Sequence, residues 1–123
     1  MAFDAIGIVT EDYEKALRFY RLLGVEFVRA GDSEHFDAKT PSGVRLLMDT
    51  VKVIKSFEPD YEHVRGTGMS LCFKQESRAK VDEVYAAVTA AGFKGKKAPW
   101  DAFWGQRYAC LLDPDGNQID LFA

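Results

Sequence analysis

The stretch FDAIGIVTEDYEKALRFYRLLGVEFV, from Phe3 to Val28, changes its hydrophobic period part-way along. Its first residues alternate in the manner of a β-strand, with successive side chains on opposite faces. A helical stripe follows, formed by Tyr13, Ala16, Leu17, Tyr20 and Leu23. Thr10 is expected to cap this helix, with Glu11 and Asp12 in its first turn. Gly24 is expected to end it. The stretch therefore predicts a strand followed by an amphipathic helix.

The second half of the chain repeats this pattern. Residues 69 to 73 predict a strand, Ser77 a helix cap and Gly92 a helix end. The helical stripe between them consists of Val81, Val84, Tyr85, Val88 and Ala91. Each half then has short strand-like runs and a turn, TPSG over 40–43 or DPDG over 113–116, in which Pro sets the turn and Gly permits a positive φ. Aligning the turns brings the stripes into register, so we interpret the chain as an internal duplication.

This repeat predicts an α+β fold of two tandem βαβββ modules. Module one covers about 1–50 and module two about 66–123, joined by an irregular linker over about 51–65, and the whole chain, 1–123, forms a single domain. One helix covers only one face of each four-stranded mixed sheet, so the two curved sheets are expected to form a cup. Alternation predicts the residues that face this cup: Ala5, Gly7, Val9, Ser70, Cys72, Lys74 and, in the closing strands, Cys110.

The composition excludes several classes of protein. A net charge of −3, without a long run of like charges, is atypical of nucleic-acid-binding proteins. No apolar run approaches the roughly 20 residues of a membrane helix. Cys72 and Cys110 are too few for a disulfide framework, and we expect both to be small buried hydrophobic residues. We therefore predict a soluble, cytoplasmic protein with neither nucleic acid nor membrane as a partner.

Two segments resemble a known family. These are the Phe3 to Val28 stretch and PWDAFWGQRYACLLDPDGNQIDLF, from Pro99 to Phe122. Together with the duplication, they make the chain similar to the vicinal oxygen chelate superfamily, which holds glyoxalase I, extradiol dioxygenases, fosfomycin resistance enzymes and bleomycin resistance proteins. The resemblance covers essentially the whole chain and implies the glyoxalase/bleomycin resistance fold. It also implies a homodimer.

In the metal enzymes of this family, four positions hold ligands to a divalent cation. By the resemblance, these positions are occupied here by Ala5, Leu47, Ser70 and Asp120. Of the four, only Asp120 would be a good ligand, because the first two have no donor atom and a serine hydroxyl is weak. A shift of two residues in the first half would bring Asp49 to the hairpin position, which still leaves too few donors. We therefore expect no metal and no cofactor.

The two histidines do not restore a metal site. His35 and His63 fall outside every ligand position, and we expect each to be an exposed strand or linker residue. The incomplete ligand set argues against glyoxalase, dioxygenase and thiol-transferase chemistry alike. A binding cup is the feature that remains.

The most distinctive local cluster is PWDAFWGQR over 99–107, which contains both tryptophans of the chain, Trp100 and Trp104, and also Phe103. Flat aromatic side chains in a concave site stack on a planar ligand at low conformational cost. Arg107 and Asp101 could orient such a ligand. The alternative is structural: one Trp closes the core and the other covers the dimer contact. The sequence leaves both interpretations open.

Asp120, buried without a metal, would need a hydrogen-bond donor or a cationic group of a ligand. Arg45 could supply that partner, which would make the carboxylate structural. The complete set of predicted ligand-binding residues is Trp100, Phe103, Trp104, Arg107, Ser70, Asp120 and Arg45.

These features favour a metal-free binding protein of the bleomycin-resistance type, which sequesters a small, partly planar molecule. The competing hypothesis is an enzyme of the same fold, a lyase, isomerase or dioxygenase-type protein. It would use Asp120 or Asp49 as general base, or a divalent metal. A ligand sensor or partner-binding subunit is a third possibility. The sequence does not identify the ligand.

Overall fold

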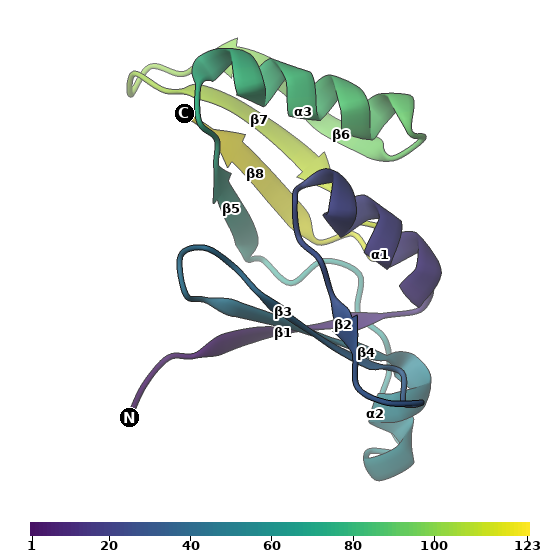
Figure 1. Cartoon of the computed structure of the whole chain (residues 1–123). Coiled ribbons are helices and arrows are strands. Elements are labelled where there is room, and N and C mark those ends of the chain that lie inside the picture. Colours follow the sequence, from purple (N-terminus) through teal and green to yellow (C-terminus); the bar gives the residue numbers. More distant parts are fainter. The chain divides into compact units, whose positions relative to one another are not determined.

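The computed structural model describes all residues from 1 to 123, and the chain divides into two compact units, residues 1–64 and 65–123. Unit 1 contains, in order, β1 (Ala5–Thr10), α1 (Tyr13–Leu22), β2 (Val28–Arg29), β3 (His35–Lys39), β4 (Arg45–Thr50) and α2 (Val51–Phe57) (Figure 1). Its sheet has the order β1-β4-β3-β2, with β1 parallel to β4 and the other pairs antiparallel.

Unit 2 repeats this order from the first strand to the last, without a counterpart of α2. It contains β5 (Ser70–Lys74), α3 (Arg78–Ala90), β6 (Lys94–Asp101), β7 (Arg107–Leu112) and β8 (Gln118–Phe122). The sheet order is β5-β8-β7-β6, again with one parallel pair, β5 with β8. The predicted α+β fold of two βαβββ modules is therefore confirmed. None of the three helices is long and apolar enough to cross a bilayer.

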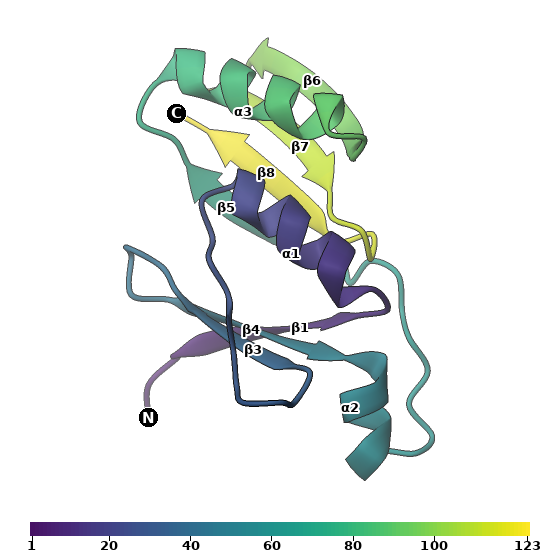
Figure 2. The same cartoon turned by 45° about the vertical axis from the view of Figure 1, so that its right-hand side comes forward.

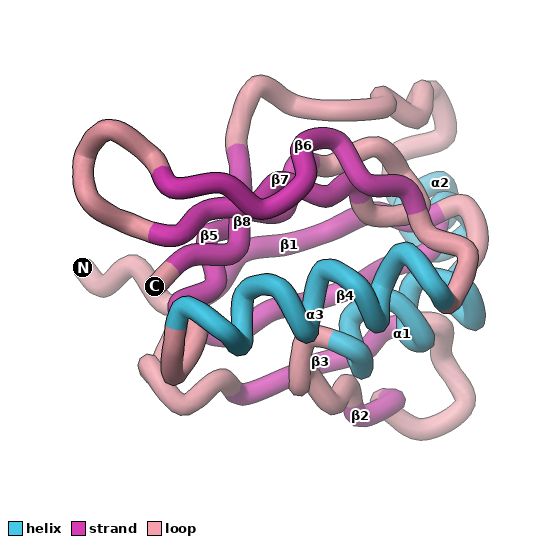
Figure 3. Tube along the Cα trace, turned by 90° about the horizontal axis from the view of Figure 1, so that it is seen from above, coloured by secondary structure: helices cyan, strands magenta, loops and turns pink.

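The segment predicted as an irregular linker from residue 51 in fact begins with a helix. Figure 2 shows α2 continuing directly from β4. Thr50 caps it, because its hydroxyl accepts a hydrogen bond from the Val53 N–H at 3.2 Å. The helix has only seven residues, too few to show a clear apolar period in the sequence. The rest of the segment, up to β5, has no helix or strand, as Figure 3 shows.

The helix starts are set by polar side chains. Ser77 caps α3 as predicted, accepting from the Lys80 N–H at 3.1 Å. The predicted cap of α1 is wrong by two residues: Asp12, not Thr10, accepts from the Lys15 N–H, at 3.1 Å. Thr10 instead ends β1 and its hydroxyl accepts from the Asp12 N–H at 3.2 Å. A carboxylate is as good a cap as a hydroxyl, so the sequence alone did not separate the two.

Alternation along the strands produces one buried face in each sheet. In unit 1 this face consists of Ile8, Phe36, Ala38, Leu46 and Met48. In unit 2 it consists of Ala109, Leu111, Ile119 and Leu121, which lie beneath the buried Val81 and Val88 of α3. The opposite face of the unit 2 sheet is therefore free of its own helix, and it contains Asp120.

Candidate functional site

The candidate site in unit 2 lies on the sheet face opposite α3, which we name the Asp120 face. Its side chains are Ser70, Cys72 and Lys74 of β5, Gln118, Asp120 and Phe122 of β8, Tyr108, Cys110 and Leu112 of β7, and Trp100 of β6. In the strand register, Asp120 lies between Cys72 on one neighbouring strand and Cys110 on the other. Asp120 is therefore central to this face, as its alternation predicted.

The carboxylate of Asp120 is only 5% exposed and is held by hydrogen bonds. The Tyr108 hydroxyl donates to Oδ2 at 2.6 Å, and the Gln118 side-chain amide donates to Oδ1 at 2.9 Å. The Cys72 thiol lies 3.9 Å from the same Oδ2. Gln118 is itself fixed, because its Oε1 accepts from the Lys96 ammonium at 2.6 Å. A buried charge is stable only when hydrogen-bond donors surround it. Tyr108 and Gln118 are therefore the donors that a buried Asp120 was expected to require.

Sequence reasoning missed Tyr108 and Gln118 as partners of this carboxylate. The available signal was alternation, since both residues share the parity of Asp120 along their strands. The sequence does not show that β7 pairs with β8. This pairing places Tyr108 opposite Phe122, which lies two residues from Asp120 on the same face of β8. Tyr108 meets Asp120 only through this pairing, whereas Gln118 lies two residues from Asp120 on the same strand.

Two protonation equilibria on this face are shifted. Burial, and then the bond to Asp120, raise the pKa of the Tyr108 hydroxyl. Burial, followed by the charge of Asp120, raises the pKa of the Cys110 thiol to about 11. At neutral pH, Tyr108 is therefore a hydrogen-bond donor and Cys110 a neutral thiol. The prediction of a buried cysteine is confirmed for Cys110 but wrong for Cys72, which is exposed.

An aromatic cluster adjoins this network through Tyr108. The Tyr108 ring lies 5.3 Å, centroid to centroid, from both Trp100 and Trp104, and 6.2 Å from Phe122. The two indoles meet edge to face at 6.2 Å. Trp104 is 49% exposed, and Phe103, at 5.0 Å from it, is 97% exposed. The predicted Trp100, Trp104 and Asp120 are thus brought together, whereas Phe103 lies at the outer edge of the cluster.

Arg107 is not brought to the Asp120 face. It shares the parity of the residues beneath α3, and its guanidinium pairs with Asp82 of that helix at 3.0 Å and with Asp101 of β6 at 3.2 Å. Arg78 of α3 also pairs with Asp101. The hydrogen bond that the guanidinium donates to Asp82 is the main cause of the raised pKa of Arg107. The structure therefore places Arg107 and Asp101 in an ion-pair network that joins α3 to its sheet, away from Asp120.

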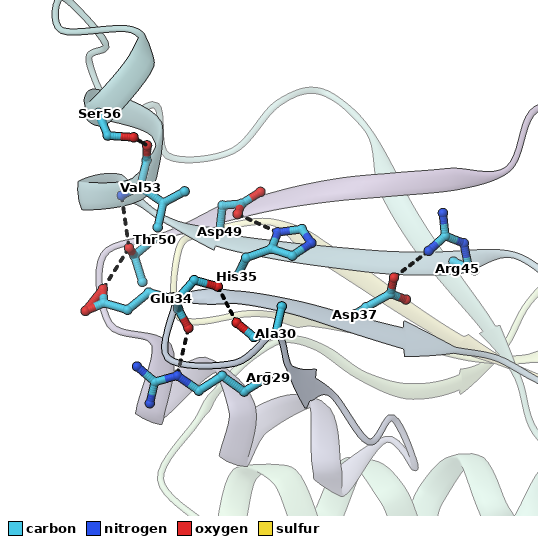
Figure 4. Close-up of polar contacts among 11 residues, drawn as sticks. Arg29, Ala30, Glu34, His35, Asp37, Arg45, Asp49, Thr50, Val53 and Ser56 are labelled. Atoms are coloured by element: carbon cyan, nitrogen blue, oxygen red, sulfur yellow. Dashed lines mark hydrogen bonds and ion pairs between the residues drawn. The ribbon is translucent and has the colours of Figure 1, made fainter.

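In unit 1, Arg45 also lies in an ion-pair network. It pairs with Asp4 at 2.6 Å and with Asp37 on the neighbouring strand. The hydrogen bond between Arg45 and Asp4 lowers the pKa of Asp4 and raises the pKa of Arg45. Figure 4 shows Arg45 and Asp37 pointing toward each other from β4 and β3. The pairing of Arg45 with Asp120 stays a prediction.

Asp49 has a partner that the sequence did not indicate. The strand register places it opposite His35, and the His35 Nδ1 lies 2.6 Å from its Oδ1 (Figure 4). His35 is therefore a half-buried, paired residue rather than the exposed one predicted. The pairing arises from the antiparallel register of β3 and β4, which the separation of the two residues in the sequence does not reveal.

Comparison with known proteins identifies the family. A model described as Glyoxalase/Bleomycin resistance protein/Dioxygenase superfamily matches residues 2–121. The chain belongs to this superfamily. No curated protein matches its sequence. The resemblance predicted from the two motifs and the repeat is therefore confirmed at the level of the superfamily.

Several solved structures share the fold. A glyoxalase/bleomycin resistance protein/dioxygenase family enzyme from Burkholderia phytofirmans PsJN is 20% identical, with a TM-score of 0.83 over 99% of this chain and 98% of that one. A glyoxalase-related enzyme from Fulvimarina pelagi is 19% identical, with a TM-score of 0.82 over 96% and 84%. A lactoylglutathione lyase from Agrobacterium tumefaciens is 20% identical, with a TM-score of 0.73 over 98% and 92%. Identities this low establish the fold alone.

The residues at the family's ligand positions do not fit a divalent cation. Ala5 and Leu47 have hydrocarbon side chains. The Ser70 hydroxyl is a weak neutral ligand and lies 3.6 Å from the Cys72 sulfur. Both oxygens of Asp120 already accept hydrogen bonds. A cation needs several converging carboxylate or imidazole donors, and this set offers one carboxylate.

Proposed function

We propose that this protein binds a small, partly planar organic molecule on the Asp120 face, without a metal ion, in the manner of ligand-sequestering members of the superfamily. The single observation that carries the proposal is the placement of the aromatic cluster. Trp100, Trp104 and Phe122 all contact the ring of Tyr108, whose hydroxyl bonds to the buried carboxylate of Asp120. The site therefore combines flat apolar area with a fixed polar group, as small-molecule sites do.

The geometry of the cluster favours stacking. Trp104 leaves about half of its surface accessible, and its ring lies at 79° to that of Tyr108 and at 90° to that of Trp100. A planar ligand can therefore face one ring while its edge meets another. Each such ring pair contributes about 0.5–1.5 kcal/mol beyond the burial of apolar area, and burial adds about 25 cal/mol per Å². Micromolar affinity is attainable without any covalent chemistry.

An acid–base enzyme is the second candidate, and the Asp49–His35 pair is the observation that favours it. A carboxylate bonded to one ring nitrogen fixes the histidine tautomer, so that the other nitrogen is available for a substrate proton. Asp120 is a poorer base, because donors already occupy both of its oxygens. A ligand that is recovered unchanged after prolonged incubation with the protein supports binding alone, and a converted ligand supports this second candidate.

Intrinsic fluorescence tests the proposal directly, because both tryptophans of the chain lie in the aromatic cluster. We expect planar compounds such as naphthalene-2-carboxamide to quench this fluorescence saturably. Replacing Trp104 with Ala should weaken binding by about 1–3 kcal/mol, as loss of a central aromatic contact does. Phe57→Ala, which removes an exposed ring of α2, is the matched control. A folded W104A variant with unchanged affinity would show that Trp104 is structural.

The absence of a metal is tested separately. We expect metal analysis of the purified protein to find no stoichiometric cation. We also expect Mn²⁺, Zn²⁺, Ni²⁺ and Fe²⁺ to leave the melting temperature unchanged, since only a ligand of the native state raises it. A rise that depends on cation concentration and disappears in Asp120→Asn would contradict the metal-free proposal.

A further inference from the structure

A pocket of about 280 Å³ lies at the end of the Asp120 face where β8 begins. It is lined by Gly66, Thr67, Gly68, Met69, Ser70, Lys96, Leu112, Gly116 and Gln118. Ser70 and Leu112 are both register partners of Gln118, so these three side chains belong to the Asp120 face at the first residue of β8. Gln118 therefore lies in the wall of the pocket and also bonds to Asp120.

The other wall of the pocket depends on two glycines. Gly66, in the segment before β5, and Gly116, in the turn between β7 and β8, both have positive φ, +78° and +82°. A Cβ on Gly66 would lie 3.3 Å from the carbonyl oxygen of Gly116. Figure 2 shows this segment running beside the β7–β8 turn. A side chain on Gly66 would crowd this approach, whereas a Cβ on Gly116 would lie no closer than 3.5 Å to its neighbours.

The pocket offers positive charge and donors. Lys96 donates to the Gln118 amide oxygen at 2.6 Å, and no carboxylate lies within ion-pair distance of it. The backbone N–H groups of residues 66–69 donate no hydrogen bond within the chain. Arg65 adjoins the glycine contact, with its guanidinium fixed by the Pro114 carbonyl at 3.0 Å. A cation beside unused backbone donors is an arrangement that favours an anion.

The acidic groups of the neighbouring turn do not oppose this charge at the pocket. Asp113 is 4% exposed, and its carboxylate accepts from the N–H groups of Asp115 and Asn117 at 2.9 and 2.8 Å. Asp115 is 2% exposed. Neither residue lines the pocket. Lys96 is therefore the charged side chain that a bound group would meet.

We propose that this pocket binds the anionic end, a carboxylate or a phosphate, of the molecule whose planar part lies on the aromatic cluster. This inference rests on the proposed function and adds the class of ligand. Gln118 at the pocket and Phe122 in the cluster are four residues apart on β8. At about 3.4 Å per residue, the two ends of the site are roughly 14 Å apart. The ligand is an elongated anion with a planar head and a flexible arm.

Naphthyl probes test the length and charge of this ligand together. The series consists of ω-(2-naphthyl)alkanoates with acid chains of increasing length, each compared with its neutral primary amide by tryptophan quenching. The longest acid should bind about tenfold more tightly than its amide, as a charge-assisted hydrogen bond allows. Lys96→Met should lower the affinity of the acid until it no longer exceeds the affinity of the amide. Lys80→Met, an exposed lysine of α3, should change neither value.

Equal binding of acid and amide, or an equal effect of the two lysine variants, would overturn the anion pocket while leaving the aromatic site intact.

A titration without any aromatic group separates the two proposals. Inorganic phosphate, and acetate in a parallel arm, should shift the backbone amide NMR signals of Gly66 and Gly68 in the wild type and not in Lys96→Met. If no naphthyl compound quenches but phosphate shifts these signals, the proposed function fails and the pocket stands. If neither anion shifts them, the pocket is refuted.

Discussion

Replacing Tyr108 with Phe removes the donor to the buried carboxylate and keeps the ring. The lost bond joins the Tyr108 hydroxyl to Asp120 Oδ2 at 2.6 Å, while the ring contacts to Trp100 and Trp104, both at 5.3 Å, are retained. A hydrogen bond to a charged group contributes about 1.5–3 kcal/mol to stability. We therefore expect the free energy of unfolding to fall by about 2 kcal/mol. For a domain near this size, at about 4 °C per kcal/mol, the melting temperature should fall by about 8 °C.

Urea unfolding followed by tryptophan fluorescence measures this change. Tyr85→Phe is the matched control, because the Tyr85 hydroxyl makes no hydrogen bond within the chain, and its free energy of unfolding should change by less than about 0.5 kcal/mol. A double-mutant cycle with Asp120→Asn isolates the pairwise coupling. Equal losses in the two tyrosine variants would refute the reasoning, as would a cycle in which Tyr108→Phe costs the same with and without the carboxylate.

Two further predictions concern the thiols. Iodoacetamide at pH 8 should modify the exposed Cys72 in the native protein. It should leave Cys110 unmodified, because this thiol is buried and its pKa is raised to about 11. An adduct found on Cys110 by mass spectrometry would contradict the assigned burial. Stability should also fall as the pH rises from about 9 to about 11, because the unfolded state releases the Cys110 and Tyr108 protons at lower pH than the folded state does. Denaturant unfolding across this range should show a shallower decline in Cys110→Ala than in Cys72→Ala, and identical slopes would exclude the thiol as a cause.

The polar network around Asp120 and the pocket share a residue. Gln118 is central to both, because its amide group donates to Asp120 while its oxygen accepts from Lys96. Changes at the pocket can therefore reach the carboxylate through one side chain. The aromatic cluster contacts the same carboxylate from the other end through Tyr108. The Asp120 face is in this sense one continuous site.

Features that depend on neighbouring residues could be predicted from the sequence. The strand and helix periods, the Ser77 cap and the glycine turns each depend on local backbone preferences, and all are found in the structure. Alternation also placed Cys72 and Asp120 on the same sheet face, because the strand period of two is a property of the chain itself. The resemblance to the family rested on the two segments, Phe3 to Val28 and Pro99 to Phe122, and on the duplication, and the family model confirms it.

Only the tertiary structure decided which groups meet. Tyr108 reaches Asp120, and His35 reaches Asp49, through the register of paired strands, which the separation of residues along the chain does not encode. Arg107 has the parity of the helix-facing residues, and the packing of α3 on the sheet gives it acidic partners. Local sequence determines the elements, because backbone preferences act over a few residues. Long-range pairing completes the site, because the bond from Tyr108 to Asp120 joins two strands whose register is fixed only by folding.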